Sequence, residues 1–339
     1  RDYWGNELSS PSSHKSFRPL TSWTFWMDNN IASSTHQFHK TNVVLHGLVS
    51  FLVYLMTKKA GFKANIACLS GLLFLVHPIH CECVANISGR AEILGAFFSV
   101  SSVLLLMHFL VEEDKPFWST LVFLCGLCMS LCAVLSKETG IMGVMVLLLY
   151  AHSHGSPNRT QQKAKLGILY AWFILVLVIR VSMNGGKPTF SKFDNPLLET
   201  VDINTLYVNC NAFFLLLSPS IMCADYSGFD PGDASLFGRR VLVTICATLL
   251  IGVLALRAAR SSRIKLAFLW LTVPYIPAMN IFVRVGFVIA ERTLYTSSIG
   301  WAQLVAYFLN RGMEAQHNGL RTFSRLTTTL LFLVFSAQT

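Results

Sequence analysis

The chain has 339 residues, of which 53% are hydrophobic and only 13% are charged, and its mean hydropathy is +0.53. A soluble domain carries roughly a quarter charged residues, so the composition excludes an ordinary soluble domain and predicts an all-α polytopic membrane protein. The formal net charge of +10 does not indicate nucleic-acid binding, because the basic residues lie in short loops between apolar runs, where they set membrane topology.

Residues 1–41 are polar and aromatic, and tryptophan favours the membrane–water interface. This stretch therefore predicts a surface-lying loop or a pair of short helices. It contains a basic cluster, His14, Lys15 and Arg18, and the following Pro19 disfavours helix at the residue before it. Such a cluster suits an anion such as a lipid phosphate. The alternative is a basic anchor that meets anionic headgroups and carries no chemistry.

Two groups of apolar runs follow, at residues 42–57, 64–79, 93–111, 117–136, 139–152 and 166–183, and then at 241–257, 264–283, 294–309 and 326–337. A spanning helix needs about 17–25 residues, so the shorter runs must borrow flanking residues. Lysine and arginine concentrate in one set of connecting loops, which we predict to be cytosolic. The opposite loops are predicted to be luminal or exterior.

These features predict a first luminal loop, a first part of a helix bundle, a luminal interval and a second part of the bundle, with the boundaries 1–41, 42–183, 184–240 and 241–339. The interval contains an apolar patch at 205–222, which we predict to be a re-entrant or interfacial helix. If this patch spanned the membrane, the basic loop at 257–265 would become luminal, against the positive-inside rule.

Ionisable residues gather on the predicted luminal side. Beyond the basic cluster they include His77, His80, Glu82, Arg90, Glu92, Lys137, Glu138, Asp225, Arg284, Glu291 and Arg292. Ionisable groups at membrane depth are expensive and are candidates for function by default. The alternative is that adjacent opposite charges form ion pairs that hold helices together.

Three further patterns contain residue types that can carry chemistry. The run from His77 to Cys83 contains zinc-ligand residue types, but its spacing is not that of a structural zinc site, so we predict a helix end stopped by Pro78 and no metal. Cys125, Cys128 and Cys132 share one face of a helix that we expect to be buried. Asn86 begins a glycosylation sequon, and its position very near the membrane disfavours its use.

Six short motifs occur in an order that resembles one known family, the transmembrane and TPR-repeat-containing (TMTC) O-mannosyltransferases of the endoplasmic reticulum. The motifs are Trp4-Gly5 with Ser13-His14-Lys15-Ser16-Phe17-Arg18-Pro19-Leu20-Thr21, His77-Pro78-Ile79-His80-Cys81-Glu82-Cys83-Val84 with Gly89-Arg90-Ala91-Glu92, Ser136-Lys137-Glu138-Thr139-Gly140-Ile141, Phe193-Asp194-Asn195-Pro196, Asp225-Tyr226-Ser227 and Ala290-Glu291-Arg292-Thr293-Leu294-Tyr295.

The resemblance implies a multispanning C-type glycosyltransferase (GT-C) fold in the endoplasmic reticulum membrane with a luminal active site. It implies dolichyl-phosphate mannose as the donor, and Ser or Thr of extracellular domains such as cadherins as the acceptor. The family carries an acidic pair upstream of the Trp-Gly motif, so we expect the general base to lie ahead of Arg1. TPR repeats are expected after residue 339.

Residue by residue, the resemblance and the charges suggest two groups of site residues. For the donor phosphate we expect His14, Lys15, Arg18, Arg90 and Arg292. As cavity residues we expect His80, Glu82, Glu92, Lys137, Glu138, Asp225 and Glu291. The sequence leaves open whether a divalent ion assists. A lipid or solute transporter and a non-enzymatic membrane scaffold are the alternatives to an enzyme.

Overall fold

The computed structural model describes residues 3, 5–7, 13, 15–111, 116–152, 159–183, 190, 195, 197, 203–219, 222–223, 226 and 237–338. Within these residues every regular element is a helix. The chain forms two compact units, Arg1–Phe62 with Cys83–Thr189 and Lys63–Glu82 with Phe190–Thr339. Each unit is therefore assembled from segments that are far apart in the sequence.

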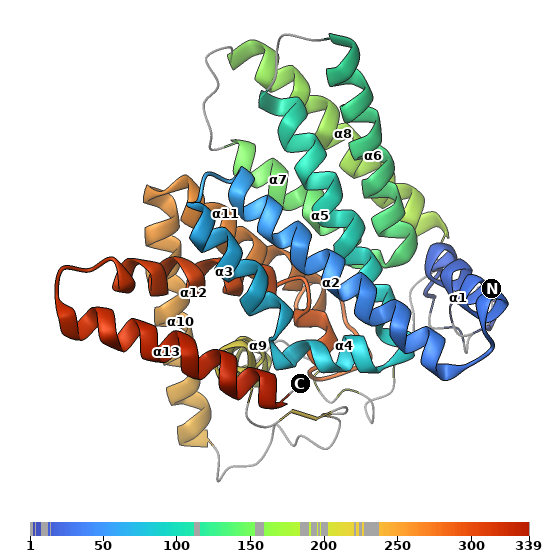
Figure 1. Ribbon diagram of the computed structural model, residues 1–339. Coiled ribbons are helices and arrows are strands. Elements are labelled where there is room, and N and C mark those ends of the chain that lie inside the picture. Colours follow the sequence, from blue (N-terminus) through green and yellow to red (C-terminus); the bar gives the residue numbers. More distant parts are fainter. Residues whose placement is uncertain are drawn as a thin grey trace. The chain divides into compact units, whose positions relative to one another are not determined.

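The first unit contains the long helices of the N-terminal half. They are α1 (Pro19–Ile31), α2 (Thr35–Lys59), α5 (Arg90–Val111), α6 (Pro116–Ser136), α7 (Met142–His152) and α8 (Arg159–Met183), with the 3₁₀ turns η2 (Ile87–Gly89) and η3 (Glu138–Ile141). Helix α5 forms the centre, because it packs against α6, α2 and α7 (Figure 1). Pro19 occupies the first turn of α1, where its missing N–H costs nothing.

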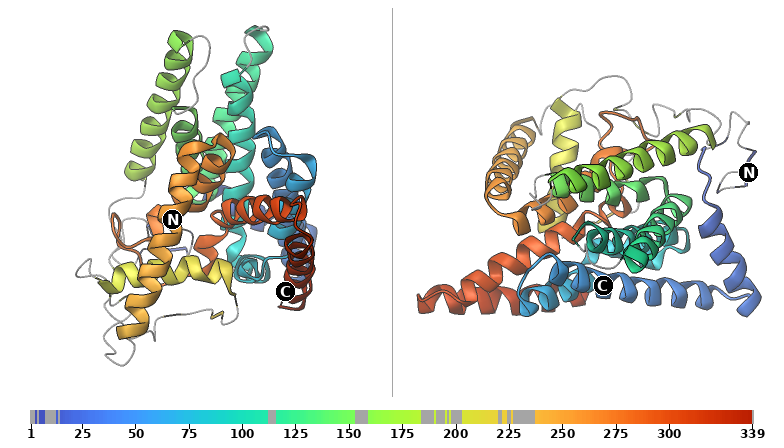
Figure 2. Two further views of the ribbon diagram at one scale, coloured as in Figure 1. Left: turned by 90° about the vertical axis from the view of Figure 1, so that its left-hand side faces the viewer. Right: turned by 90° about the horizontal axis from the view of Figure 1, so that it is seen from above.

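The second unit begins with α3 (Ala64–Leu75) and returns at α9 (Ile203–Leu217). Its other helices are α10 (Phe237–Arg260), α11 (Ser262–Thr272), α12 (Ser298–Met313) and α13 (Asn318–Gln338), with the 3₁₀ segments η1 (Pro78–His80), η6 (Val273–Ala278) and η7 (Glu291–Leu294). The five residues of α4 (Cys81–Ala85) follow η1. Helix α12 packs against α3, α11 and α13, and α12 and α13 form a hairpin (Figure 2).

Among the described residues, 5 helices are long and apolar enough to cross a membrane, or up to 6 if α3 and the bent segment after it form one span. Four of them, Thr35–Lys59, Ile87–Leu110, Phe117–Ser136 and Gln161–Met183, fall in or near predicted apolar runs of the first unit. The fifth is Val241–Arg260 in the second unit. These helices agree with the expected polytopic all-α architecture.

Two predicted runs are interrupted by proline. The run at 64–79 stops at Leu75, because Pro78 lacks an N–H and begins a separate turn. The run at 264–283 ends as α-helix at Thr272, because Pro274 and Pro277 cannot continue the hydrogen-bond ladder and the chain tightens into η6. A continuous helix through residue 283 was therefore the wrong expectation.

Two other predictions concern the short helix α9 and the cysteines of α6. Helix α9 has 15 residues, which is short of the roughly 20 that a span requires, and its re-entrant or interfacial placement stays a prediction. The cysteines of α6 are less buried than expected, since Cys125 and Cys128 are exposed and Cys132 is half-buried. Their face of α6 is not covered by the described part of the chain, so close packing does not explain them.

Candidate active site

In the first unit two arginines meet on one carboxylate. Glu138 accepts hydrogen bonds from Arg18, with Nε 3.1 Å and Nη2 2.9 Å from Oε2. Its other oxygen, Oε1, lies 2.6 Å from Nη2 of Arg180. These three residues, here called the Arg18–Glu138–Arg180 cluster, combine the predicted Arg18 and Glu138 with an arginine that the sequence analysis did not select.

Local structure explains why the three side chains converge. Arg18 is the residue that precedes α1, Glu138 opens η3 directly after α6, and Arg180 lies in the last turn of α8. A buried hydrogen bond from Thr21 Oγ1 to the Ser136 carbonyl oxygen, 2.9 Å long, ties the start of α1 to the end of α6. The extended backbone of Lys137 then turns Glu138 out of the α6 axis.

Burial and charge act in opposite directions on Glu138. Burial raises the pKa of its carboxyl group, but the charges of Arg18 and Arg180 and the hydrogen bond from Arg18 outweigh burial, so that the pKa lies below its usual value. Glu138 is therefore ionised at neutral pH. Its side chain is 28% exposed and that of Arg18 is 18% exposed, so both can be reached from outside the protein.

Tyr3 completes the surroundings of Arg18. The guanidinium carbon of Arg18 lies 5.1 Å from the centre of the Tyr3 ring, and the Tyr3 hydroxyl donates to the Ser88 carbonyl oxygen at 3.2 Å. Burial raises the pKa of Tyr3 to about 12, with Arg18 acting in the opposite direction. Tyr3 is thus a neutral aromatic support for the Arg18 guanidinium.

Lys15, Lys137 and Glu92 are also in this unit. Lys137 forms an ion pair with Glu92, and both side chains are largely buried. Lys15 is buried in a left-handed conformation with φ of 54°, and its backbone N–H donates to Ser13 Oγ at 3.1 Å. The predicted luminal turns of the first unit therefore contain two separate ion-pair clusters, one around Glu138 and one around Glu92.

Arg90 has a different environment from Arg18. Its side chain is fully buried, and its guanidinium lies 2.6 Å from Asp28 Oδ2 and 2.8 Å from Asn42 Oδ1. It also donates to the Phe38 carbonyl oxygen at 2.9 Å and lies over the Phe25 ring at 4.5 Å. Because these partners occupy the guanidinium, Arg90 joins α1, α2 and α5, and we leave it out of the proposed phosphate ligands.

In the second unit Arg292 binds Glu82. The guanidinium Nη1 forms an ion pair with Glu82 Oε1, and the backbone N–H of Arg292 donates to Glu82 Oε2 at 2.7 Å. The Arg292 side chain is 38% exposed, whereas that of Glu82 is 9% exposed. Arg292 is therefore partly exposed next to a largely buried carboxylate.

The neighbouring Glu291 is buried and has different partners. Its Oε1 accepts hydrogen bonds from the Tyr226 hydroxyl and from the Cys223 backbone N–H, both at 2.7 Å. Burial raises the pKa of Glu291, and these two hydrogen bonds oppose the rise. The pKa of Tyr226 is raised by burial and by the hydrogen bond to Glu291. Glu291 thus anchors the chain around Cys223.

The histidines of the predicted second turn are packed rather than open. His77 Nδ1 accepts from the Ile79 N–H at 3.1 Å, and its Nε2 lies 3.1 Å from the Leu216 carbonyl oxygen. His80 Nε2 lies 2.8 Å from Ser298 Oγ, and its ring contacts Phe74. The structure does not place His80 in an open polar cavity, because its ring is buried against Phe74 and Tyr295 and contacts the Ser298 hydroxyl. No metal-binding group of three or more His, Cys, Asp or Glu occurs among the described residues.

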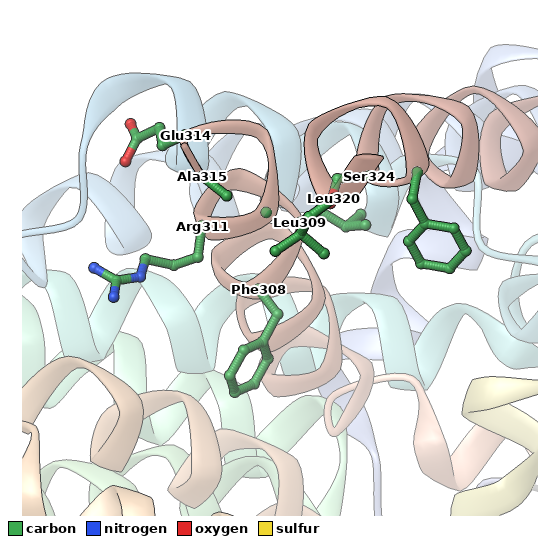
Figure 3. A pocket seen from close by; sticks show the side chains of 9 residues that line it. Phe308, Leu309, Arg311, Glu314, Ala315, Leu320 and Ser324 are labelled. Carbon is green, nitrogen blue, oxygen red and sulfur yellow. The ribbon is translucent and has the colours of Figure 1, made fainter. Parts of the chain in front are cut away.

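The remaining predicted residues and the pocket add little chemistry. His14 and Asp225 lie outside the described residues. Asn86 is exposed, and its Oδ1 accepts from the Ser88 N–H at 3.0 Å and from Ser88 Oγ at 2.8 Å. A pocket lies where α12 meets α13 (Figure 3), but none of the predicted site residues lines it, and its Glu314 pairs with Lys63 at 2.8 Å.

Comparison with known proteins identifies the family. Residues 14–183 match the model of the family described as dolichyl-phosphate-mannose-protein mannosyltransferase. Protein O-mannosyl-transferase F38B6.6 of Caenorhabditis elegans is 33% identical over 327 residues, which cover 92% of this chain and 45% of that protein. Mouse TMTC4 is 33% identical, and the match covers 90% of this chain and 49% of that protein.

The chain belongs to this mannosyltransferase family. Human protein O-mannosyl-transferase TMTC3 is 32% identical, with 90% of this chain and 37% of that protein covered. The chain thus spans about half the length, or less, of these relatives. The TMTC resemblance seen in the motifs is confirmed.

The fold of this mannosyltransferase-family chain is GT-C. An archaeal oligosaccharyltransferase, AglB from Archaeoglobus fulgidus in complex with an inhibitory peptide and a dolichol-phosphate, has a TM-score of 0.56 and 14% identity. The match covers 96% of this chain and 48% of AglB. At this identity the likeness establishes the fold alone, and it agrees with the GT-C prediction.

Proposed function

We propose that the protein containing this chain transfers mannose from dolichyl-phosphate mannose to Ser or Thr hydroxyls of secretory-pathway proteins. The family description names dolichyl-phosphate mannose and protein, which supports this donor and a protein acceptor. The reaction would take place in the lumen of the endoplasmic reticulum, and cadherin-type extracellular domains are the acceptors that the family resemblance favours.

One structural observation supports the proposal most directly. Arg18 lies within the segment that matches the family model, and Glu138 fixes its guanidinium through two nitrogen atoms while the side chain stays partly exposed. A guanidinium held in this way is pre-oriented for a phosphate oxygen. We assign Arg18 to the donor phosphate, with Lys15 of the same unit as a further cation and with Glu138 orienting Arg18.

The chemistry is a direct displacement at the anomeric carbon of mannose. The bond from this carbon to the phosphate oxygen breaks as the bond to the acceptor oxygen forms, which inverts the configuration. The acceptor proton passes to a general base. Dolichyl phosphate leaves with both electrons of the broken bond, and Arg18 stabilises its negative charge.

The test uses the complete protein in membranes that lack its relatives. Labelled dolichyl-phosphate mannose and a cadherin-type domain are supplied, and label in the acceptor is measured for the parent and for Arg18→Ala. We expect transfer by the parent and a loss of about tenfold or more in the variant. Arg325→Ala, which removes an exposed arginine of α13, serves as the matched control.

The outcomes separate the candidate functions. Transfer by the parent and by Arg325→Ala, but not by Arg18→Ala, supports the enzyme and the phosphate contact together. Normal transfer by Arg18→Ala would overturn the assignment of Arg18. No transfer by a folded parent with any acceptor domain would favour a membrane scaffold, and flux of lipid or solute without transfer would favour a transporter.

A further inference from the structure

Arg180 is an unexpected charge near the end of an otherwise apolar helix. It lies within the candidate span Gln161–Met183, and its side chain is only 5% exposed. A charged side chain in such a position costs free energy, and it normally pairs with an opposite charge or a polar group. Glu138 is the one ion-pair partner of Arg180 in the described part of the chain.

Glu138 accepts a hydrogen bond from only one of the three nitrogen atoms of the Arg180 guanidinium. An arginine has five N–H donors, and of these Nη2 donates to Glu138 at 2.6 Å. The Nε and Nη1 atoms are both buried, and neither meets a hydrogen-bond partner among the described residues. These atoms carry three N–H bonds, so more than half of the donor capacity of a buried cation is unused. Leaving buried charged donors unpaired costs more than leaving neutral ones unpaired.

The charge balance of the cluster points in the same direction. Two guanidiniums share one carboxylate, which leaves one positive charge in excess. Both oxygens of Glu138 are already occupied, so this carboxylate cannot satisfy the remaining donors of Arg180. The excess positive charge and the unused donors of Arg180 together favour an anion as the missing partner.

We infer that Arg180 is a second ligand of the donor phosphate, and that its unused Nη1 donates to a phosphate oxygen while Glu138 holds its Nη2. This inference rests on the proposed function for the identity of the donor. A phosphate oxygen accepts a strong, charge-assisted hydrogen bond from a guanidinium N–H group. The ligand class is a polyprenyl phosphate, because the arginine lies at the end of a candidate membrane span. Glu138 is then a positioning residue that sets the distance between two phosphate ligands.

A purely structural role makes a different prediction. If Arg180 served only to hold Glu138, replacing it would lower stability and would leave phosphate affinity unchanged in the folded protein. If it binds phosphate, Arg180→Gln removes a poorly satisfied buried charge while Arg18 still holds Glu138. Stability should then change little, and phosphate affinity should fall.

The experiment measures binding rather than transfer. The complete protein in lipid nanodiscs is titrated with a short-chain polyprenyl phosphate, with the matching polyprenol and with inorganic phosphate, and the melting temperature is recorded in parallel. The variants are Arg180→Gln and Arg180→Lys. The control is Lys165→Gln, which removes a positive charge from the same helix, where Lys165 donates to the Phe109 carbonyl oxygen at 2.9 Å.

We expect the parent and Lys165→Gln to bind the polyprenyl phosphate and not the polyprenol. Arg180→Gln should weaken this binding about tenfold or more, and Arg180→Lys should weaken it less, because lysine keeps the positive charge and loses the planar guanidinium geometry. Equal affinity of Arg180→Gln and the parent would overturn the inference. Inorganic phosphate binding as tightly as the lipid, and lost in Arg180→Gln, would overturn the assignment to a lipid.

This outcome can be told apart from a failure of the proposed function. A parent that binds polyprenyl phosphate through Arg180 but transfers no mannose would refute the proposed transfer and would support the inference. A parent that transfers mannose, with an Arg180→Gln variant that binds and transfers equally well, would refute the inference alone.

Discussion

The guanidinium of Arg90 lies 2.6 Å from the carboxylate of Asp28, and the two side chains are 0% and 5% exposed. This pair joins α1 to α5 inside the first unit. The family resemblance had suggested Arg90 as a phosphate ligand, and its burial instead favours a role in holding the N-terminal helix in place. Since α1 begins next to Arg18, the pair also positions the residue that we assign to the donor.

Breaking this pair should be strongly destabilising. Asp28→Ala leaves the Arg90 charge buried without its carboxylate, which typically costs about 3–5 kcal/mol. We expect a marked fall in the thermal midpoint, measured by unfolding of the purified protein in detergent, and loss of activity through loss of folded protein. Asn29→Ala, at the neighbouring position of α1, is the control. A midpoint equal to that of the parent would show that the pair contributes no net stability.

Glu138→Gln tests the cluster through pH. The folded-state pKa of Glu138 is lowered, so the ionised carboxylate adds stability that is fully present above its ordinary pKa of about 4.3 and is lost as pH falls through the lower folded value. We therefore expect the parent to be more stable than the variant at neutral pH. The difference between them should shrink as the pH drops below about 4. Unfolding curves at several pH values check this expectation, and a difference that grows on acidification would contradict it.

Glu291→Gln should show the opposite pH dependence. Burial raises the pKa of Glu291, so the folded state disfavours its ionised form, and its contribution to stability declines as pH rises from about 4.3 through the folded value. Glutamine keeps an oxygen that can accept from Tyr226 and from the Cys223 N–H. We expect the variant to match or exceed the stability of the parent at pH 7 and to lose this advantage in acid. A variant that is less stable than the parent at pH 7 would rule out the predicted cost of ionisation.

Gly300 tests the packing of the second unit. A Cβ atom at this position would lie 2.2 Å from the Ala267 carbonyl oxygen and 2.2 Å from the Leu271 backbone nitrogen, both on α11. Gly300→Ala must therefore push α12 away from α11, and we expect a loss of roughly 1–3 kcal/mol.

The matched control is Gly252→Ala on α10, where a Cβ would meet nothing within 4 Å. This change should be neutral or stabilise by about 0.5–1 kcal/mol, because alanine is the better helix former. Thermal midpoints of both variants provide the measurement. Equal thermal midpoints for the two variants would show that α11 and α12 can move apart at little cost in stability.

The sequence by itself determined the class of molecule, the family and most of the helices, because these depend on local patterns. Apolar runs must become helices in a membrane, and Pro19 fixed the start of α1. The same local rules explain the errors, since Pro274 and Pro277 interrupt a run that hydropathy alone joined. The ordered motifs were specific enough to indicate the family without any knowledge of contacts.

Only the tertiary structure decided which charges act together. Arg18, Glu138 and Arg180 are separated in the chain by 120 and 42 residues, and no local pattern predicts that they meet. Arg180 lay unnoticed at the end of an apolar run, whereas Arg90 belonged to a motif and proved to be buried against Asp28. The physical reason is that the function of a charge depends on its burial and on the partners that occupy its donors, and packing sets both.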